Sequence, residues 1–179
     1  MMLKAAQQSV KRLLDDRGVA GEDVVVDIDI PGFIWAITRG EYYVIFVEDI
    51  SKATAQSVFD FCTEAKVKRC IVAFRGKCTP TASKELNGFK ACRFEKFKME
   101  EIARVPLIFS ACNTYKILTG PEAEEVFQKY GRANLAKIWT TDIVQRYFDA
   151  PVGAVYRTIE TFGSLQPEVK YRLVCCQHQ

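Results

Sequence analysis

Residues 42–75 read YYVIFVEDISKATAQSVFDFCTEAKVKRCIVAFR and decide the fold of the first half of the chain. Tyr42 to Glu48 is apolar on both faces, which is typical of a central strand. Ser51 can cap a helix with one apolar stripe, and Lys68 to Arg75 then returns as a second strand. A crossover of about 20 residues fits a right-handed parallel connection, so the stretch predicts a β-α-β unit with its helix over the sheet.

Elements predicted on either side of this unit extend it into an α/β layer structure. Apolar residues recur at helical spacing over residues 3–14 and Gly18 follows, which predicts an amphipathic helix closed by a left-handed glycine. Asp23 to Ile30 alternates in the manner of a strand with one solvated face. Ile34 to Thr38 is a further strand, and Gly40 supplies the positive φ of a tight hairpin. Downstream, the pattern predicts a strand at Phe89 to Phe97 and a short helix at Met99 to Arg104.

The rest of the chain is predicted to form a second, smaller domain. Val105-Pro106 interrupts the pattern, because the residue before a proline avoids helical geometry. The domain boundary is therefore placed between residues 1–106 and residues 107–179. Leu107 to Leu118 is expected to be extended.

Two capped helices and two strands are predicted within this second domain. Thr119 and Glu122 form a capping box, and Gly131 ends the helix that follows. Asp142 begins a second short helix, which continues through Phe148. Strands at residues 155–160 and 170–174 close the chain. The expected fold is an α/β N-terminal domain, with a mixed sheet flanked by helices, and a small α+β C-terminal domain.

The composition of the 179 residues is that of a soluble globular protein, with 49% hydrophobic and 26% charged residues. The longest apolar runs are far shorter than the roughly 20 residues of a membrane helix, and the N-terminus lacks the apolar block of a secretory signal. No two of the seven cysteines have the two-residue gap that zinc sites favour, so reduced, intracellular thiols and no metal site are expected. The net charge of +3 neither requires nor excludes nucleic acid.

Residues suited to catalysis are few. The only histidine is His178, close to the C-terminus, which disfavours a Cys-His or Ser-His site. The best catalytic candidate is a metal-dependent nuclease, in which Asp27, Asp29 and Glu48 hold a cation and Glu64-Ala65-Lys66 supplies an acid-x-lysine spacing. The same residues also fit an ordinary wet strand face and a helix end. A stand-alone nuclease or DNA-repair protein remains the alternative function.

Two groups of residues are candidates for binding rather than catalysis. Arg75, Lys77 and Lys84 surround Thr79-Pro80 after a central strand, and such cations can neutralise phosphates without reading bases, although a solvated turn looks the same. In the C-terminal domain, aromatic residues are candidate interface anchors or core residues, and Tyr171 between two charged neighbours favours the core. These aromatic residues are Tyr156, Phe162 and Tyr171.

The C-terminal sequence resembles the assembly domain of the small jaw-and-assembly subunit that eukaryotic nuclear RNA polymerases share and that archaeal RNA polymerases also contain. The matching residues come in the same order as in that family. They are Leu118-Thr119-Gly120-Pro121-Glu122, Asp142-Ile143-Val144, Tyr147, Gly153, Val155 and Tyr171-Arg172-Leu173-Val174. The resemblance is good over residues 94–175. Before them, Thr79-Pro80-Thr81-Ala82 looks like a turn of the family's jaw domain, and Asp15-Asp16-Arg17-Gly18 looks like its first helix end.

The chain also departs from the family pattern. The family's histidine- and proline-containing signature falls on Phe109 to Tyr115, where neither residue is present, and Ile143 replaces the usual proline. The Ser-Glu-Thr of the last loop is missing as well. These departures put the contacts made by the signature in doubt and suggest a specialised paralogue, such as one dedicated to polymerase I, or a viral copy.

The resemblance implies a non-catalytic subunit of a multisubunit DNA-directed RNA polymerase. Residues 1–106 then form a jaw along the downstream duplex, with Arg75, Lys77, Thr79, Pro80 and Lys84 near the DNA in non-specific contacts. Residues 107–179 dock on the largest subunit, with Tyr156, Phe162, Tyr171 and Arg172 as interface candidates. No cofactor, membrane contact or homo-oligomer is expected. The expected location is the nucleus, the nucleolus for polymerase I, or the cytoplasm or virion for a viral copy. A transcription-associated adaptor that borrowed the assembly domain is a third hypothesis.

Overall fold

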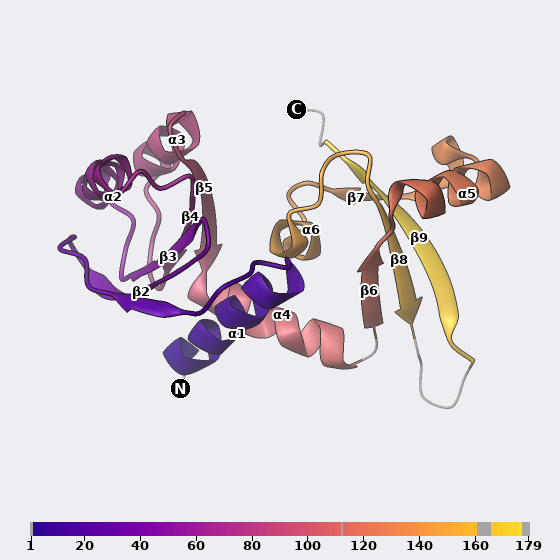
Figure 1. Cartoon of the computed structure of the whole chain (residues 1–179), viewed down its shortest axis with the longest axis horizontal. Coiled ribbons are helices and arrows are strands. Elements are labelled where there is room, and N and C mark those ends of the chain that lie inside the picture. The colour runs from indigo at the N-terminus through magenta and orange to yellow at the C-terminus, as the bar shows by residue number, and fades with distance from the viewer. Residues whose placement is uncertain (1, 112, 161–165, 177–179) are drawn as a thin grey trace. The chain divides into compact units, whose positions relative to one another are not determined.

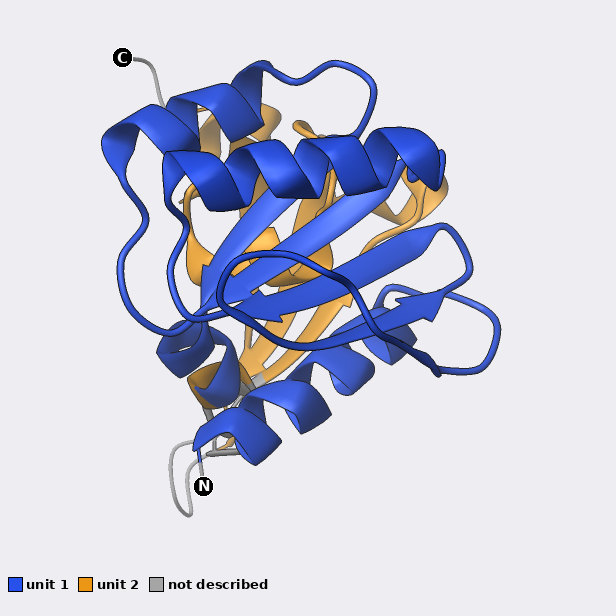
Figure 2. Cartoon of the chain, turned by 90° about the vertical axis from the view of Figure 1, so that its left-hand side faces the viewer, with its two compact units in different colours: residues 1–103 blue, residues 104–179 orange. Residues whose placement is uncertain are grey.

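The computed structural model describes residues 2–111, 113–160 and 166–176, which form a mixed α/β fold with two mixed sheets flanked by helices (Figure 1). The chain divides into two compact units, coloured separately in Figure 2: unit 1 is Met1–Ala103 and unit 2 is Arg104–Gln179. Each unit has a sheet of its own. Among the described residues, no helix combines the length and the apolar character needed to cross a membrane.

Unit 1 is built on a five-stranded sheet in the order β1-β2-β3-β4-β5, with β3 in the centre as predicted. The first three strands pair antiparallel, whereas β3, β4 and β5 run parallel. Helices α2 and α3 cover one face of this sheet and α1 covers the other (Figure 2). The elements are α1 (Met2–Asp16), β1 (Val24–Val26), β2 (Phe33–Arg39), β3 (Tyr42–Val47), α2 (Lys52–Glu64), β4 (Arg69–Phe74), α3 (Pro80–Gly88) and β5 (Arg93–Lys98).

The local signals in unit 1 act as the sequence predicts. Gly18 follows α1 with φ of 69°, and Gly40 turns the β2-β3 hairpin with φ of 56°, both in the left-handed region that glycine tolerates. The Ser51 hydroxyl accepts a hydrogen bond from the Thr54 amide at 3.1 Å and caps α2. The β3-α2-β4 unit is therefore confirmed as a parallel crossover.

Two groups of ion pairs tie α1 to the sheet of unit 1. Arg17, just beyond α1, donates two hydrogen bonds to the Glu95 carboxylate of β5, at 2.9 and 2.6 Å, and its side chain is only 3% exposed. Arg39 at the end of β2 donates to Asp23 at 2.7 Å and also to Asp15 of α1. Because these pairs bridge distant parts of the sequence, they fix the helix against the strands.

Two elements of unit 1 differ from the prediction. The strand expected over residues 23–30 is limited to Val24–Val26, although Ile28 and Ile30 remain buried in the core. Among the described strands, β1 is an edge strand that pairs with β2 alone, so no second neighbour extends its ladder. The Thr79-Pro80 turn is the start of a helix that the prediction missed, since Thr79 caps α3 and Pro80 occupies its first turn.

The stretch after β5 also corrects the prediction. Helix α4 runs over Met99–Ala111, through Pro106, so residues 107–111 are helical and not extended. Met99, Ile102 and Val105 lie fully buried at helical spacing, and this burial outweighs the one backbone hydrogen bond that a proline removes. Pro106 therefore marks no break in the backbone. The division between the two units falls after Ala103.

Unit 2 is built on a four-stranded sheet in the order β6-β8-β9-β7, in which β7 pairs parallel with β9 and the other pairs are antiparallel. The capping box of Thr119 and Glu122 and the cap at Asp142 are present as predicted. Strand β7 was not predicted. The elements are β6 (Asn113–Ile117), α5 (Gly120–Tyr130), the short 3-10 turn η1 (Arg132–Asn134), β7 (Ala136–Trp139), α6 (Ile143–Phe148), β8 (Val155–Glu160) and β9 (Glu168–Cys175).

Helices cover both faces of the unit 2 sheet. Val155 and Leu173 face α5, which contributes Ala123 and Val126 to that core. The neighbouring Tyr156 and Val174 belong to the opposite core, with Val144 of α6. Strands β8 and β9 therefore alternate between two apolar layers, as expected for central strands buried on both faces.

Candidate functional site

The predicted cationic residues of unit 1 lie in a loop at the carboxyl ends of the parallel strands β3 and β4. Arg75 follows β4 directly, and its guanidinium donates to the Glu48 carboxylate at 2.7 Å. The Glu48 carbonyl accepts hydrogen bonds from the amides of Arg75, at 3.1 Å, and Gly76, at 2.7 Å. In parallel sheets ligands usually bind at this edge. The loop is therefore well placed for binding, but one of its cations already has a carboxylate partner.

Asp49 holds the middle of this loop in place. Its carboxylate accepts a hydrogen bond from the Lys77 amide and lies against Gly76. A Cβ atom at Gly76 would lie 2.3 Å from the Asp49 Oδ1 atom, so any other residue there requires the carboxylate to move. Ile50 extends the clamp, since its amide donates to the Lys77 carbonyl at 2.8 Å and its carbonyl accepts from the Thr79 amide at 3.0 Å. The loop presents its side chains from a fixed backbone.

The other predicted residues of this site lie on α3. The Thr79 hydroxyl accepts from the Ala82 amide at 3.3 Å, and Pro80 begins the helix. Lys84 is exposed in the second turn. The side chains of Lys77 and Lys84 form no ion pair with a described residue, so both ammonium groups are accessible to an anion. The structure thus places Arg75, Lys77 and Thr79 in one exposed loop, with Pro80 and Lys84 on the helix that follows it.

The carboxylates of the nuclease alternative are divided between different places. Asp27, Asp29 and Glu64 line one hollow of about 340 Å³, whereas Glu48 lies beside Arg75 in the cationic loop. Lys66 adopts a left-handed φ of 52° after α2 and lines a different hollow from Glu64. Within the described ranges, no three Asp, Glu, His or Cys side chains converge as metal ligands. Glu64 therefore shares a hollow with Asp27 and Asp29, whereas Lys66 and Glu48 do not line it.

Three cysteines of unit 1 form a buried cluster. The thiols of Cys70 and Cys92 both contact Cys62, at the end of α2, and all three are at most 3% exposed. The hydrogen bond with Cys70, together with burial, raises the pKa of Cys62 against the opposing effect of the bond with Cys92. The bond with Cys62 and burial raise the pKa of Cys92. Neutral, buried thiols are poor nucleophiles. Their role is in packing.

The predicted interface residues of unit 2 have different environments. Tyr156 is fully buried and its hydroxyl donates to Gln145 Oε1 at 2.8 Å, so the expectation that it is a surface anchor is wrong. Tyr171 is half-buried, with its ring 5.6 Å from that of Tyr130. Phe162 lies outside the described residues. Arg172 is also half-buried, with 39% of its side chain accessible.

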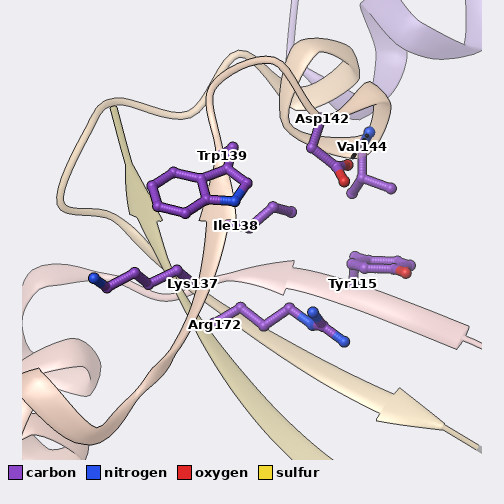
Figure 3. Close-up of a pocket in the computed structure, with 7 residues that line it drawn as sticks. All are labelled: Tyr115, Lys137, Ile138, Trp139, Asp142, Val144 and Arg172. Atoms are coloured by element: carbon purple, nitrogen blue, oxygen red, sulfur yellow. Dashed lines mark hydrogen bonds between the residues drawn. The ribbon is translucent and has the colours of Figure 1, made fainter. Parts of the chain in front are cut away.

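Arg172 borders a hollow of about 210 Å³ in unit 2, here called the Trp139 hollow (Figure 3). Figure 3 shows the rings of Trp139 and Tyr115 on opposite sides of this group of residues. Trp139 is 39% exposed, which is unusual for so large an apolar ring. The hollow is lined by Tyr115, Lys137, Ile138, Trp139, Asp142, Val144 and Arg172.

Sequence reasoning missed most of this hollow because it missed β7. Residues 136–139 have only one buried residue, Ile138, between exposed neighbours. Four residues are too few for an alternating pattern to stand out from a loop. The available signal was the Lys-Ile-Trp triplet, which places a cation and an aromatic ring on either side of an aliphatic residue.

No known protein-family profile matches the chain, and a search of curated proteins finds no matching sequence.

Proposed function

We propose that this chain is a non-catalytic subunit of a multisubunit DNA-directed RNA polymerase. In this proposal unit 1 is the jaw domain, which supports downstream DNA, and unit 2 is the assembly domain, which docks on the largest subunit. Magnesium-dependent nucleotide addition belongs to the large subunits. The chain itself contributes binding surfaces.

The observation that carries the proposal is the ordered C-terminal motif. Its residues lie within unit 2, where each has a definite structural role. Thr119 forms the capping box of α5, and Asp142 caps α6 through the Val144 amide at 2.8 Å. Gly153 turns the chain into β8 with φ of 90°, and the Tyr171 to Val174 segment lies within β9. A motif whose spaced residues support one small unit is more specific than any of its parts.

The cationic loop of unit 1 supports the DNA part of the proposal. Lys77 and Lys84 are exposed, and the loop backbone is held by Asp49 and Ile50. Lysine ammonium groups on such a loop attract phosphates without distinguishing bases. Glu48 and Asp49, which follow β3, lie against this loop, so the attraction is modest and must fall steeply with salt.

Affinity purification from the source cells tests the proposal. The tagged full-length chain is recovered at low salt after nuclease treatment, which removes proteins that are linked only through DNA, and its partners are identified by mass spectrometry. The expected result is near-stoichiometric recovery of the large polymerase subunits. Recovery of the chain without polymerase subunits refutes the proposal. Clearly sub-stoichiometric polymerase favours the adaptor hypothesis instead.

A further inference from the structure

Strand β7 lies at one edge of the unit 2 sheet, where the Trp139 carbonyl already accepts a hydrogen bond from the Asp142 amide at 2.9 Å. Among the described strands β7 is the last in the order β6-β8-β9-β7, and its only strand partner is β9. The Thr140 amide, just after β7, donates to the Cys175 carbonyl of β9. Because alternate residues of a parallel strand bond to opposite neighbours, Lys137 and Trp139 direct their amides away from β9. An extended peptide can add to such an edge through backbone hydrogen bonds.

The Trp139 hollow lies beside this edge. Ile138 and Trp139 of β7 form part of its lining. Tyr115 and Val144 are further apolar residues of this lining, and they pack in one cluster with Ile138. Its volume of about 210 Å³ is below the roughly 300–1,000 Å³ of small-molecule sites. The size fits one protein side chain better than a cofactor. Edge and hollow together therefore fit an extended segment of protein that inserts one side chain.

The charges around the hollow favour an acidic side chain. Lys137 and Arg172 are its cations, and Asp142 is its one carboxylate, which already accepts the Val144 amide as a helix cap. The nearest carboxylate to Arg172 is Glu160, at 4.0 Å, and Glu160 lies much closer to Lys170, at 2.5 Å. The Arg172 guanidinium can therefore take a carboxylate in the two-point geometry that arginine favours.

We propose that an extended acidic segment of a partner protein adds to the outer edge of β7 and places a carboxylate on Arg172 in the Trp139 hollow. The exposed Trp139 ring then packs against an apolar residue of the same segment. Identifying the partner with a polymerase subunit rests on the proposed function, whereas the site itself does not.

A peptide titration of the isotope-labelled full-length chain tests the site. The probe is a blocked peptide of about eight alternating glutamate and valine residues, long enough to cover β7, and the comparison peptide has lysine in place of glutamate. The acidic peptide is expected to shift the Trp139 indole resonance and to slow hydrogen exchange at the Lys137 and Trp139 amides. Arg172→Glu and Lys137→Glu should each weaken its binding by about tenfold. Lys129→Glu, a change of an exposed lysine on α5, should leave it unchanged.

Several results overturn the inference. They are equal binding of the two peptides, no change at Trp139 and Lys137, and a response of these resonances to duplex DNA but not to the acidic peptide. Arg172→Lys keeps the charge and guards against misfolding, so retained binding in this variant with loss in Arg172→Glu supports an electrostatic contact. If the Arg172→Glu variant still co-purifies with polymerase, that result counts against the site but not against the proposed function. If the chain binds the acidic peptide but recovers no polymerase, the result supports the site and counts against the proposed function.

Discussion

Replacing Gly76 by alanine tests the idea that Asp49 fixes the cationic loop. The new Cβ atom would lie 2.3 Å from Asp49 Oδ1 and 3.1 Å from its Cγ, so the carboxylate must move and release the Lys77 amide. Forcing an atom into an occupied site costs about 1–3 kcal/mol. The hydrogen bond that is lost involves a charged acceptor but lies on the surface, so a total of about 2 kcal/mol is expected.

The assay is urea unfolding of the full-length chain, followed by the fluorescence of Trp35 in a Trp139→Phe background. Trp35 packs edge-on against Phe46 of β3, at 5.2 Å between ring centroids, and so reports on unit 1. A loss of about 2 kcal/mol corresponds to a melting temperature lower by about 10 °C for a unit of this size. Hydrogen exchange at the Lys77 backbone amide should also become faster, because this amide loses its hydrogen bond to Asp49.

A double-mutant cycle gives the result that would refute this reasoning. In Asp49→Ala the obstructing carboxylate is absent, so adding Gly76→Ala should cost little, and the two changes should couple by more than about 1 kcal/mol. The φ of Gly76 lies outside the left-handed region, so a backbone penalty does not obscure the comparison. If the two substitutions prove additive, Asp49 does not limit the space at Gly76.

Three further outcomes are expected. Glu95→Gln, which removes the carboxylate that lies 2.6 Å from the 3%-exposed Arg17 side chain, should destabilise unit 1 by about 3 kcal/mol in urea unfolding. The hydrogen bond from Arg39 lowers the pKa of Asp23 in the folded state. The stabilisation that the ionised Asp23 carboxylate gives the fold is therefore complete above the ordinary Asp pKa, and it is lost as pH falls through the lower, folded value. Asp23→Asn should therefore be about 1 kcal/mol less stable than wild type at neutral pH, with the difference vanishing in acid titrations. Lys77→Ala should weaken binding to duplex DNA for all sequences alike and reduce the slope of log affinity against log salt by about 1, measured by fluorescence anisotropy.

Each of these outcomes has a matched control. Glu41→Gln alters a carboxylate that is 54% exposed and 3.8 Å from Arg69, so it should change stability by less than about 1 kcal/mol. Lys129→Ala removes an exposed lysine of unit 2 and should leave the salt slope of DNA binding as it is. An acid titration of Asp23→Asn that parallels wild type at every pH would mean that Arg39 does not hold Asp23 ionised.

Local signals predicted the elements whose ends are marked by caps and glycines. Ser51, Thr119 and Asp142 each cap a helix where expected, because the orphan amides of a first turn need an acceptor nearby in sequence. Gly40 set the hairpin for the same kind of local reason. The error at Pro106 has a tertiary origin, since burial of Ile102 and Val105 decides the helix and no local rule includes it.

The candidate sites were predictable only in part. The cationic loop follows from Arg75-Gly76-Lys77 coming after a buried strand, but its clamp depends on Asp49, which is distant from it in sequence. Tyr156 was wrongly predicted as an interface residue because aromatic residues occur in both cores and interfaces. Its contact with Gln145, which the structure reveals, identifies it as a core residue. The Trp139 hollow joins residues of β6, β7, β9 and α6, so no short stretch of sequence contains it.

The position of β9 between β8 and β7 has a consequence for synthesis on the ribosome. Residues 136–139 emerge well before their only strand partner among the described strands, which is complete only when residue 175 has left the exit tunnel. Unit 1 does not depend on a strand from the end of the chain, because all strands of its sheet precede residue 99. The first unit can therefore fold while the second is still being translated. A premature stop codon before residue 168 would leave β7 and β8 unjoined and destroy only the later unit, a pattern that limited proteolysis of truncated chains would reveal.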